Sequence, residues 1–320
     1  MATKRILVTG GTGFLGSALV RNLIHKGHSV RILDDGSRGS VGRLEDIRSQ
    51  FEFVDGDVRN AEIVRSATKG MDAVAHLAIV NGTEYFYSNP ELVLDVAVKG
   101  AINTLEAAIA ENVEDYYLMS SSEVYQTPPI VPTDETVPIS IPDVLNPRYS
   151  YGGGKIISEL MAINYGRHRF RHVVIVRPHN VYGPSMGREH VIPQLALRLR
   201  DALRQYPHGA VPLPIQGDGT QTRAFIYVDD FTDGCVRAFF EGDHLGIYHV
   251  GTESEVTIAK VAKMVGAVYG REIDLQTGPP KPGGTARRCP NTAKIRSLGF
   301  VPRVSLEEGI RKTVEWYAKN

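Results

Sequence analysis

A tyrosine and a lysine four positions apart are the strongest candidates for chemistry in this sequence. Tyr151 and Lys155 enclose three glycines, and on a helix this spacing places both side chains on one face, one turn apart. A tyrosine with an ordinary pKa near 10 is a poor base at neutral pH, but a neighbouring ammonium group favours the phenolate. We therefore predict that Tyr151 is a general base and that Lys155 assists it.

A plainer interpretation is that this pair only packs on a helix surface. The intervening run Gly152–Gly154 argues against it, because each glycine inside a helix costs about 1 kcal/mol relative to alanine. Some other group is therefore expected to pass close to this backbone.

A polar cluster, Ser120-Ser121-Ser122-Glu123, follows the predicted buried strand 115–120. Open α/β sheets bind ligands at the carboxyl ends of their strands. A serine at this edge could hydrogen-bond a reacting hydroxyl, although polar strand ends are also common without any function.

A glycine-rich loop near the start of the chain predicts a dinucleotide site. Gly10, Gly13 and Gly16 directly follow a predicted strand over 5–9 and open a predicted helix over 15–26. Glycine permits the tight turn, lets the backbone approach a pyrophosphate and lets the helix pack closely on the sheet. The free N–H groups at the start of the helix then face the phosphates.

An aspartate at the end of the second predicted strand favours NAD as the cofactor. Asp34 is placed to accept hydrogen bonds from the adenosine ribose, and its charge would repel the 2′-phosphate of NADP. Arg38 lies nearby and could weaken that preference. Asp57 and Val58 follow the third strand, where they could border the adenine; an ordinary turn aspartate is nearly as good an account of Asp57.

Strands alternate with helices through the first half of the chain, which predicts an α/β fold with a doubly wound parallel sheet of the Rossmann type. Strands are expected over 5–9, 28–33, 51–54, 73–77, 115–120 and 173–176, and helices over 15–26, 61–69, 92–111 and 150–168. Residues 131–147 are expected to form a surface loop. We assign residues 1–178 to the NAD-binding domain, with some later segments returning to it.

The last third changes character. Helices are expected over 191–205, 258–269 and 306–318, with long loops over 206–222 and 278–290. We predict that residues 179–320 mostly form a smaller α+β domain that binds the substrate.

The composition limits the possible partners. The chain has 320 residues, 42% of them hydrophobic, and its 36 basic and 36 acidic side chains cancel. We therefore expect no binding to nucleic acid and none to a membrane. The sequence shows no signal peptide and no apolar span, and its two cysteines suit a reducing compartment, so a cytoplasmic location is expected. No metal site is predicted.

Several further motifs show that the chain resembles the extended short-chain dehydrogenase/reductases, in particular the nucleotide-sugar epimerase and dehydratase group. The resemblance covers nearly the whole chain. In addition to the glycine loop and the Tyr151–Lys155 pair, it depends on His76-Leu77-Ala78, Ser120–Tyr125, Arg177–Pro184, Gly217–Gly219 and Arg223–Asp229.

The resemblance implies roles for individual residues. It implies that Ser121 is the catalytic hydroxyl beside Tyr151 and Lys155. It places further cofactor contacts at Phe14, Leu15, Leu77, Ala78 and Pro178, and contacts to a nucleotide-diphosphate sugar at Ser122, Asn180, Val191, Arg223 and Arg288. Arg287 is an equally basic neighbour of Arg288. Forked guanidinium contacts suit a diphosphate in an otherwise neutral chain.

The resemblance also implies a homodimer built from the helices over 92–111 and 150–168. Apolar positions available for such a face include Leu92, Val96, Ile102, Leu105 and Ala108, although a helix facing the core would show the same pattern.

Three features differ from the usual pattern of the group and leave the sugar open. Ala97 stands where asparagine is common, His179 stands where an aromatic such as phenylalanine is usual, and Gly152–Gly154 replaces a segment rich in alanine and serine.

Glu123 bears on the choice among the reactions of the group, all of which begin with oxidation at sugar C4. Ser-Ser-Glu is similar to a Thr-Ser-Glu pattern of some dehydratases and decarboxylases, but Ser122 stands where certain dehydratases have aspartate. An epimerase is expected first, a 4,6-dehydratase second and a decarboxylase of the UDP-glucuronate type third. A non-catalytic NAD-sensing protein is the alternative from another class, and an intact set of Ser121, Tyr151 and Lys155 speaks against it.

Overall fold

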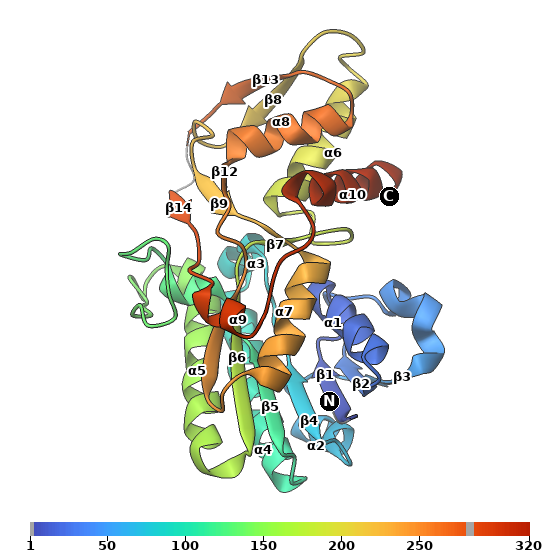
Figure 1. The fold of residues 1–320 in the computed structure, drawn as a ribbon, viewed down its shortest axis with the longest axis vertical. Helices are drawn as coiled ribbons and strands as arrows, with labels where there is room; N and C mark the ends of the chain where they lie inside the picture. The colour runs from blue at the N-terminus through green and yellow to red at the C-terminus, as the bar shows by residue number, and fades with distance from the viewer. Residues whose placement is uncertain (1–2, 280–284) are drawn as a thin grey trace.

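The main layer of the molecule is a parallel sheet (Figure 1). In the computed structural model, which describes residues 3–279 and 285–320, this sheet has seven strands in the order β11-β6-β5-β4-β1-β2-β3. The strands are β1 Arg5–Thr9, β2 Ser29–Asp34, β3 Phe51–Asp55, β4 Ala73–His76, β5 Asp115–Met119, β6 His172–Pro178 and β11 Gly246–Val250. The strand order reverses between β1 and β4, and ligands of such sheets bind in the crevice at this switch point.

Helices cover both faces of the sheet, as the alternating pattern predicts. Helices α1 (Phe14–His25) and α7 (Val228–Glu241) pack on one face, while α2 (Ala61–Thr68), α4 (Pro90–Ala110) and α5 (Ser150–Arg169) pack on the other. The doubly wound fold predicted from the sequence is therefore confirmed. Short helical segments connect these elements: η1 Val41–Gln50, α3 Thr83–Ser88, η2 Ser122–Tyr125, η3 Pro147–Tyr149 and α9 Ala293–Ser297.

A second hydrophobic core lies above the carboxyl edge of the sheet in Figure 1. It is built by α6 (Val191–Leu203), α8 (Ile258–Val268) and α10 (Leu306–Lys319) with the parallel pair β8 (Val211–Ile215) and β13 (Ile273–Thr277). Two small sheets join this part to the main layer. They contain β7 Val181–Tyr182, β10 Ile226–Tyr227, β12 Glu255–Thr257, β9 Thr222–Ala224 and β14 Arg287–Arg288.

Two of the long loops predicted from the sequence contain strands. The segment 206–222 includes β8, and the segment 278–290, of which residues 280–284 lie outside the described residues, includes β14. Strand β8 was not predicted because it contains Pro212 and Pro214. Proline cannot donate a hydrogen bond to a neighbouring strand and is confined to edge strands and irregular positions. Here β8 pairs with β13 alone, so the alternate prolines cost no hydrogen bond to a second neighbour.

Three of the five apolar residues suggested for a dimer face are buried inside the chain. Val96, Leu105 and Ala108 are buried against the sheet and belong to its core, so they cannot form a contact with another chain. The period of a helix does not say which partner its apolar face meets. The outward sides of α4 and α5 carry other apolar residues, namely Leu94, Ile157 and Leu160.

None of the helices in the described ranges is both long and apolar enough to cross a lipid bilayer.

Candidate active site

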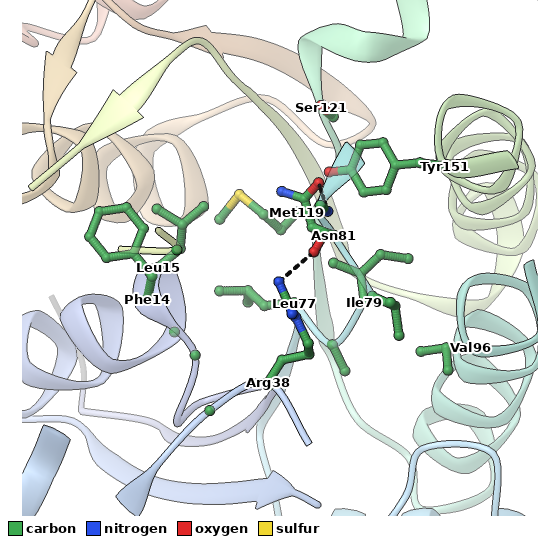
Figure 2. A pocket seen from close by; sticks show the side chains of 18 of the residues that line it. Phe14, Leu15, Arg38, Leu77, Ile79, Asn81, Val96, Met119, Ser121 and Tyr151 are labelled. Atoms are coloured by element: carbon green, nitrogen blue, oxygen red, sulfur yellow. Dashed lines mark hydrogen bonds between the residues drawn. The ribbon is translucent and has the colours of Figure 1, made fainter. Parts of the chain in front are cut away.

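A cavity of about 420 Å³ opens at the switch point of the sheet, between the sheet and the second core. Figure 2 shows Phe14 and Leu15 on one side of it and Tyr151 on the other. The structure brings most of the predicted site residues to this cavity: Gly10, Gly13, Phe14, Leu15, Gly16, Asp34, Asp57, Val58, Leu77, Ala78, Ser121, Ser122, Glu123, Tyr151, Lys155, Pro178, Asn180 and Arg288.

Two of the predicted substrate contacts do not line the cavity. Val191 is 40% exposed at the start of α6, whereas its neighbours Glu189 and His190 do line it. Arg223 lies on β9 and donates to the carbonyl oxygens of Thr222 and Thr285, each at 2.7 Å.

The glycine loop has no room for side chains. Gly10 has a φ of +72°, and a methyl group there would lie 2.8 Å from the backbone nitrogen of Ala78. A methyl group at Gly16 would lie only 2.1 Å from the carbonyl oxygen of Gly10. Helix α1 begins after Gly13 without a side-chain cap, so its first N–H groups remain available to an anion. This arrangement fits the pyrophosphate of a dinucleotide.

Asp34 is oriented by the backbone around it. One carboxylate oxygen accepts a hydrogen bond from the Thr12 N–H and the other from the Gly36 N–H, both at 2.9 Å. The carboxylate is therefore fixed at the cavity wall, where ribose hydroxyls could still donate to it. Asp57 also lines the cavity, and it forms an ion pair with Arg59 and accepts that residue's backbone N–H, as a turn aspartate does.

Tyr151 and Lys155 lie one turn apart at the start of α5. Tyr151 lies close to Ser121 (Figure 2). Burial raises the pKa of Tyr151 to about 12, and hydrogen bonding to Ser121 acts in the opposite direction. Burial lowers the pKa of Lys155 to about 8, while Glu159 partly offsets this. The Lys155 ammonium donates to the Met119 carbonyl at 2.7 Å and lies 6.0 Å from the centre of the Tyr151 ring.

The glycines between Tyr151 and Lys155 contact other segments of the chain. This agrees with the expectation that some other group passes close to this backbone. A methyl group at Gly152 would lie 2.3 Å from the side-chain nitrogen of Gln126, and one at Gly154 would lie 2.6 Å from the Cβ of Ala97 on α4. Gly154 thus lets α4 and α5 approach closely beneath the cavity.

Glu123 and Arg288 form an ion pair at the end of the cavity beside the catalytic candidates. Burial alone would raise the pKa of Glu123, but Arg288, with Arg148 and Arg223 farther away, holds it below its usual value. The adjacent Arg287 turns outward to Glu255 instead. The structure therefore places Arg288, rather than its neighbour, at the cavity.

A buried ion pair supports this region and was missed by the sequence analysis. Glu159 on α5 accepts two hydrogen bonds from Arg177 on β6, at 2.9 and 2.6 Å, and a third from Ser120. The spacing of Glu159 from Lys155, four residues along one helix, was a usable signal.

The two loop partners of Arg38, namely Asn81 and Glu189, were also missed. Arg38 donates to the Asn81 carbonyl at 2.7 Å (dashed line in Figure 2) and to Glu189 at 2.8 Å. These residues belong to three separate loops, so no local pattern could have joined them.

Comparisons with known proteins agree with this geometry. A model of the NAD dependent epimerase/dehydratase family matches residues 6–251. The chain is 31% identical to a UDP-glucose 4-epimerase of Mycolicibacterium smegmatis, with 98% of each chain covered. It is 32% identical to UDP-glucuronic acid decarboxylase 1 of Arabidopsis thaliana, covering 97% of this chain and 69% of that one. Among solved structures, a dTDP-glucose 4,6-dehydratase of Streptomyces venezuelae with NAD bound has a TM-score of 0.87 at 28% identity, covering 99% of this chain and 97% of that one.

Proposed function

The chain belongs to the NAD-dependent epimerase/dehydratase family, and from that premise we propose that it is a nucleotide-sugar 4-epimerase. As a member of this family it is an NAD-dependent enzyme that modifies nucleotide sugars. Its relatives catalyse several reactions, so the proposal concerns which of them this site performs. The ion pair between Glu123 and Arg288 carries the choice.

The cavity supplies what the cofactor needs. We assign the pyrophosphate to the loop Gly10–Gly16, the adenosine ribose to Asp34 and the nicotinamide end to Tyr151 and Lys155. When bound, NAD provides the oxidant for sugar C4 and the reductant that restores it.

Three side chains are assigned to the proton at the C4 hydroxyl. Tyr151 accepts it, Ser121 donates a hydrogen bond to the reacting oxygen, and Lys155 stabilises the phenolate by its charge. The buried environment that raises the pKa of Tyr151 to about 12 makes this cation necessary. A 4-keto sugar results, and an epimerase returns hydrogen to its other face.

Glu123 is poorly suited to the additional step of a dehydratase. That step requires an acid that protonates the C6 hydroxyl as it leaves. In this structure Arg288 pairs with Glu123 and holds its pKa below its usual value, so this carboxyl enters the reaction ionised and without a proton to give. A decarboxylase would have to bind a substrate carboxylate near the same negative charge. An epimerase needs neither acid nor carboxylate at C6.

Mass spectrometry after incubation with a panel of nucleotide sugars tests the reaction. We expect a product of unchanged mass that separates from the substrate as a new isomer. Loss of water would make the protein a dehydratase, and loss of carbon dioxide would make it a decarboxylase. Binding of NAD without turnover of any sugar would support the sensor alternative.

The variant Glu123→Gln provides an internal control for this choice. It keeps the shape of the side chain and removes the charge, so an epimerase should retain most of its turnover. A dehydratase would stop after oxidation, and bound NADH would accumulate, visible by absorbance at 340 nm. That accumulation would contradict the epimerase assignment.

We also propose that a second copy of the chain covers the outward sides of α4 and α5. Leu94, Ile157 and Leu160 are 39%, 37% and 55% exposed there, so these two packed helices present aliphatic side chains to the outside. Leu160→Glu should convert a dimer to a monomer in light scattering at micromolar concentration. A wild-type monomer under the same conditions would contradict the proposal.

We assign residues 1–178 to cofactor binding, with α7 and β11 returning to that unit, and most of 179–320 to substrate binding. The pairing of β11 with β6 supports the return. Two buried cysteines without a disulfide, Cys235 and Cys289, support the cytoplasm as the compartment.

A further inference from the structure

Arg38 lies near Asp34, where a free guanidinium would attract the 2′-phosphate of NADP and oppose the preference for NAD. It follows Asp34 by four residues, and both line the same cavity. In dinucleotide sites an acid after the second strand binds the ribose hydroxyls of NAD, whereas a nearby arginine accommodates the 2′-phosphate of NADP. This chain has both groups, so its selectivity depends on what the arginine is bonded to.

The structure holds the Arg38 guanidinium by contacts to three residues from other segments of the chain. Its Nη2 donates to the Asn81 carbonyl and to a carboxylate oxygen of Glu189, and its Cζ lies 4.4 Å above the ring of Tyr85. Glu189 is the only one of these partners that bears a charge. It comes from the loop before α6, about 150 residues away along the chain.

The backbone is shaped around this ion pair. Gly82 has a φ of +133°, and a methyl group there would lie 3.0 Å from the Glu189 carboxylate and 3.3 Å from the Arg38 guanidinium. Burial alone would raise the pKa of Glu189, but a backbone hydrogen bond and Arg38 hold it below its usual value, so the carboxylate is ionised. Arg43, another arginine at this cavity, donates to the Thr12 carbonyl and to Ser185 and is therefore already held.

We propose that Glu189 is a determinant of cofactor selectivity, because it neutralises and holds Arg38, which would otherwise attract the 2′-phosphate of NADP. Two carboxylates then act together. Asp34 repels the 2′-phosphate of NADP directly. Glu189 pairs with Arg38, so the guanidinium does not offset that repulsion. Glu189 belongs to the part of the chain that we assign to the substrate, so the selectivity is set across both parts.

Calorimetric titration of protein freed of bound dinucleotide tests this without any sugar substrate. In Glu189→Gln we expect NADP to bind about tenfold more tightly than in the wild type, the value of one charge-assisted contact. NAD affinity should change less than about threefold, because NAD lacks the phosphate. In the double variant with Arg38→Met the gain should disappear. Glu315→Gln removes the same charge from an exposed pair with Arg311 on α10 and should change neither affinity.

If NADP binds the wild type too weakly to measure, the same comparison is made in an Asp34→Ser background, where repulsion is removed. An unchanged NADP affinity on adding Glu189→Gln in that background would overturn the proposal. An equal loss of affinity for NAD and for NADP would also overturn it. That result would mean that the ion pair helps to retain either cofactor and does not distinguish between them. Neither result depends on which reaction the enzyme performs.

Discussion

The side of the cavity that we assign to the cofactor and the side that we assign to the substrate are built in different ways. On the cofactor side, backbone groups of neighbouring loops determine the shape: Gly10 packs on Ala78, and Asp34 is oriented by the N–H of Thr12. On the substrate side, Glu123 meets Arg288 across 165 residues of sequence. A backbone that is closely packed tolerates few substitutions, whereas one ion pair can be replaced by another during evolution. The first side therefore suits a ligand that stays the same, and the second suits a ligand that varies.

The largest effect on turnover is expected from a change at Tyr151, where the two sides of the cavity meet. Tyr151→Phe keeps the ring and its stacking on Phe86 but removes the group that accepts the proton. General-base catalysis is typically worth about 10²–10⁴-fold, so turnover should fall by that factor in single-turnover absorbance at 340 nm. Affinities for NAD and for the nucleotide sugar should change little. Near-normal turnover would refute the assignment of the active site.

On the cofactor side, Gly16→Ala should weaken NAD binding by about 10- to 100-fold. The added methyl group meets the Gly10 carbonyl at 2.1 Å, so the loop must shift, at a cost of about 1–3 kcal/mol. Gly153→Ala is the matched control, because its methyl group meets only the Ile141 side chain at 3.3 Å. Calorimetry with NAD should separate the two variants; equal affinities would mean that the glycine loop does not limit binding.

On the substrate side, Arg288→Leu should raise KM for the nucleotide sugar by about tenfold or more, since a charged hydrogen-bond donor is lost. NAD affinity should remain unchanged, which distinguishes this variant from Gly16→Ala. Arg287→Leu is the control, because Arg287 faces Glu255 outside the cavity. A larger effect from the control would reverse the assignment of the two arginines.

The smallest expected effect is on stability, and it depends on pH. Burial lowers the pKa of Lys155 from 10.5 to about 8, so between these values the unfolded chain binds a proton that the folded protein does not. The free energy of unfolding contributed by this group therefore rises with pH across that window. Lys155→Met lacks the contribution. The thermal midpoint of the wild type should rise relative to the variant between pH 8 and 10; a constant difference would show that the lysine is not shifted.

Much of the fold was predictable because its signals are local. Strands β1 to β6 and helices α1, α2, α4 and α5 lie within a few residues of their predicted bounds, since each is a short periodic segment next to a turn. Strand β8 was missed because its prolines resemble a loop, and α7 and β11 were not predicted individually. Three of the five residues suggested for a dimer face are buried instead, because an apolar stripe on α4 does not reveal whether the sheet or another chain covers it.

The sequence by itself determined the pattern of the glycine loop, the position of Asp34 at the end of a strand and the spacing of Tyr151 and Lys155, because each is a residue type at a fixed place in one strand, turn or helix. Tertiary structure decided which of Arg287 and Arg288 faces the cavity, and which charged partners Glu123 and Arg38 have. These pairs join segments far apart in the chain, and their electrostatic effect depends on distance and burial, neither of which a linear pattern records.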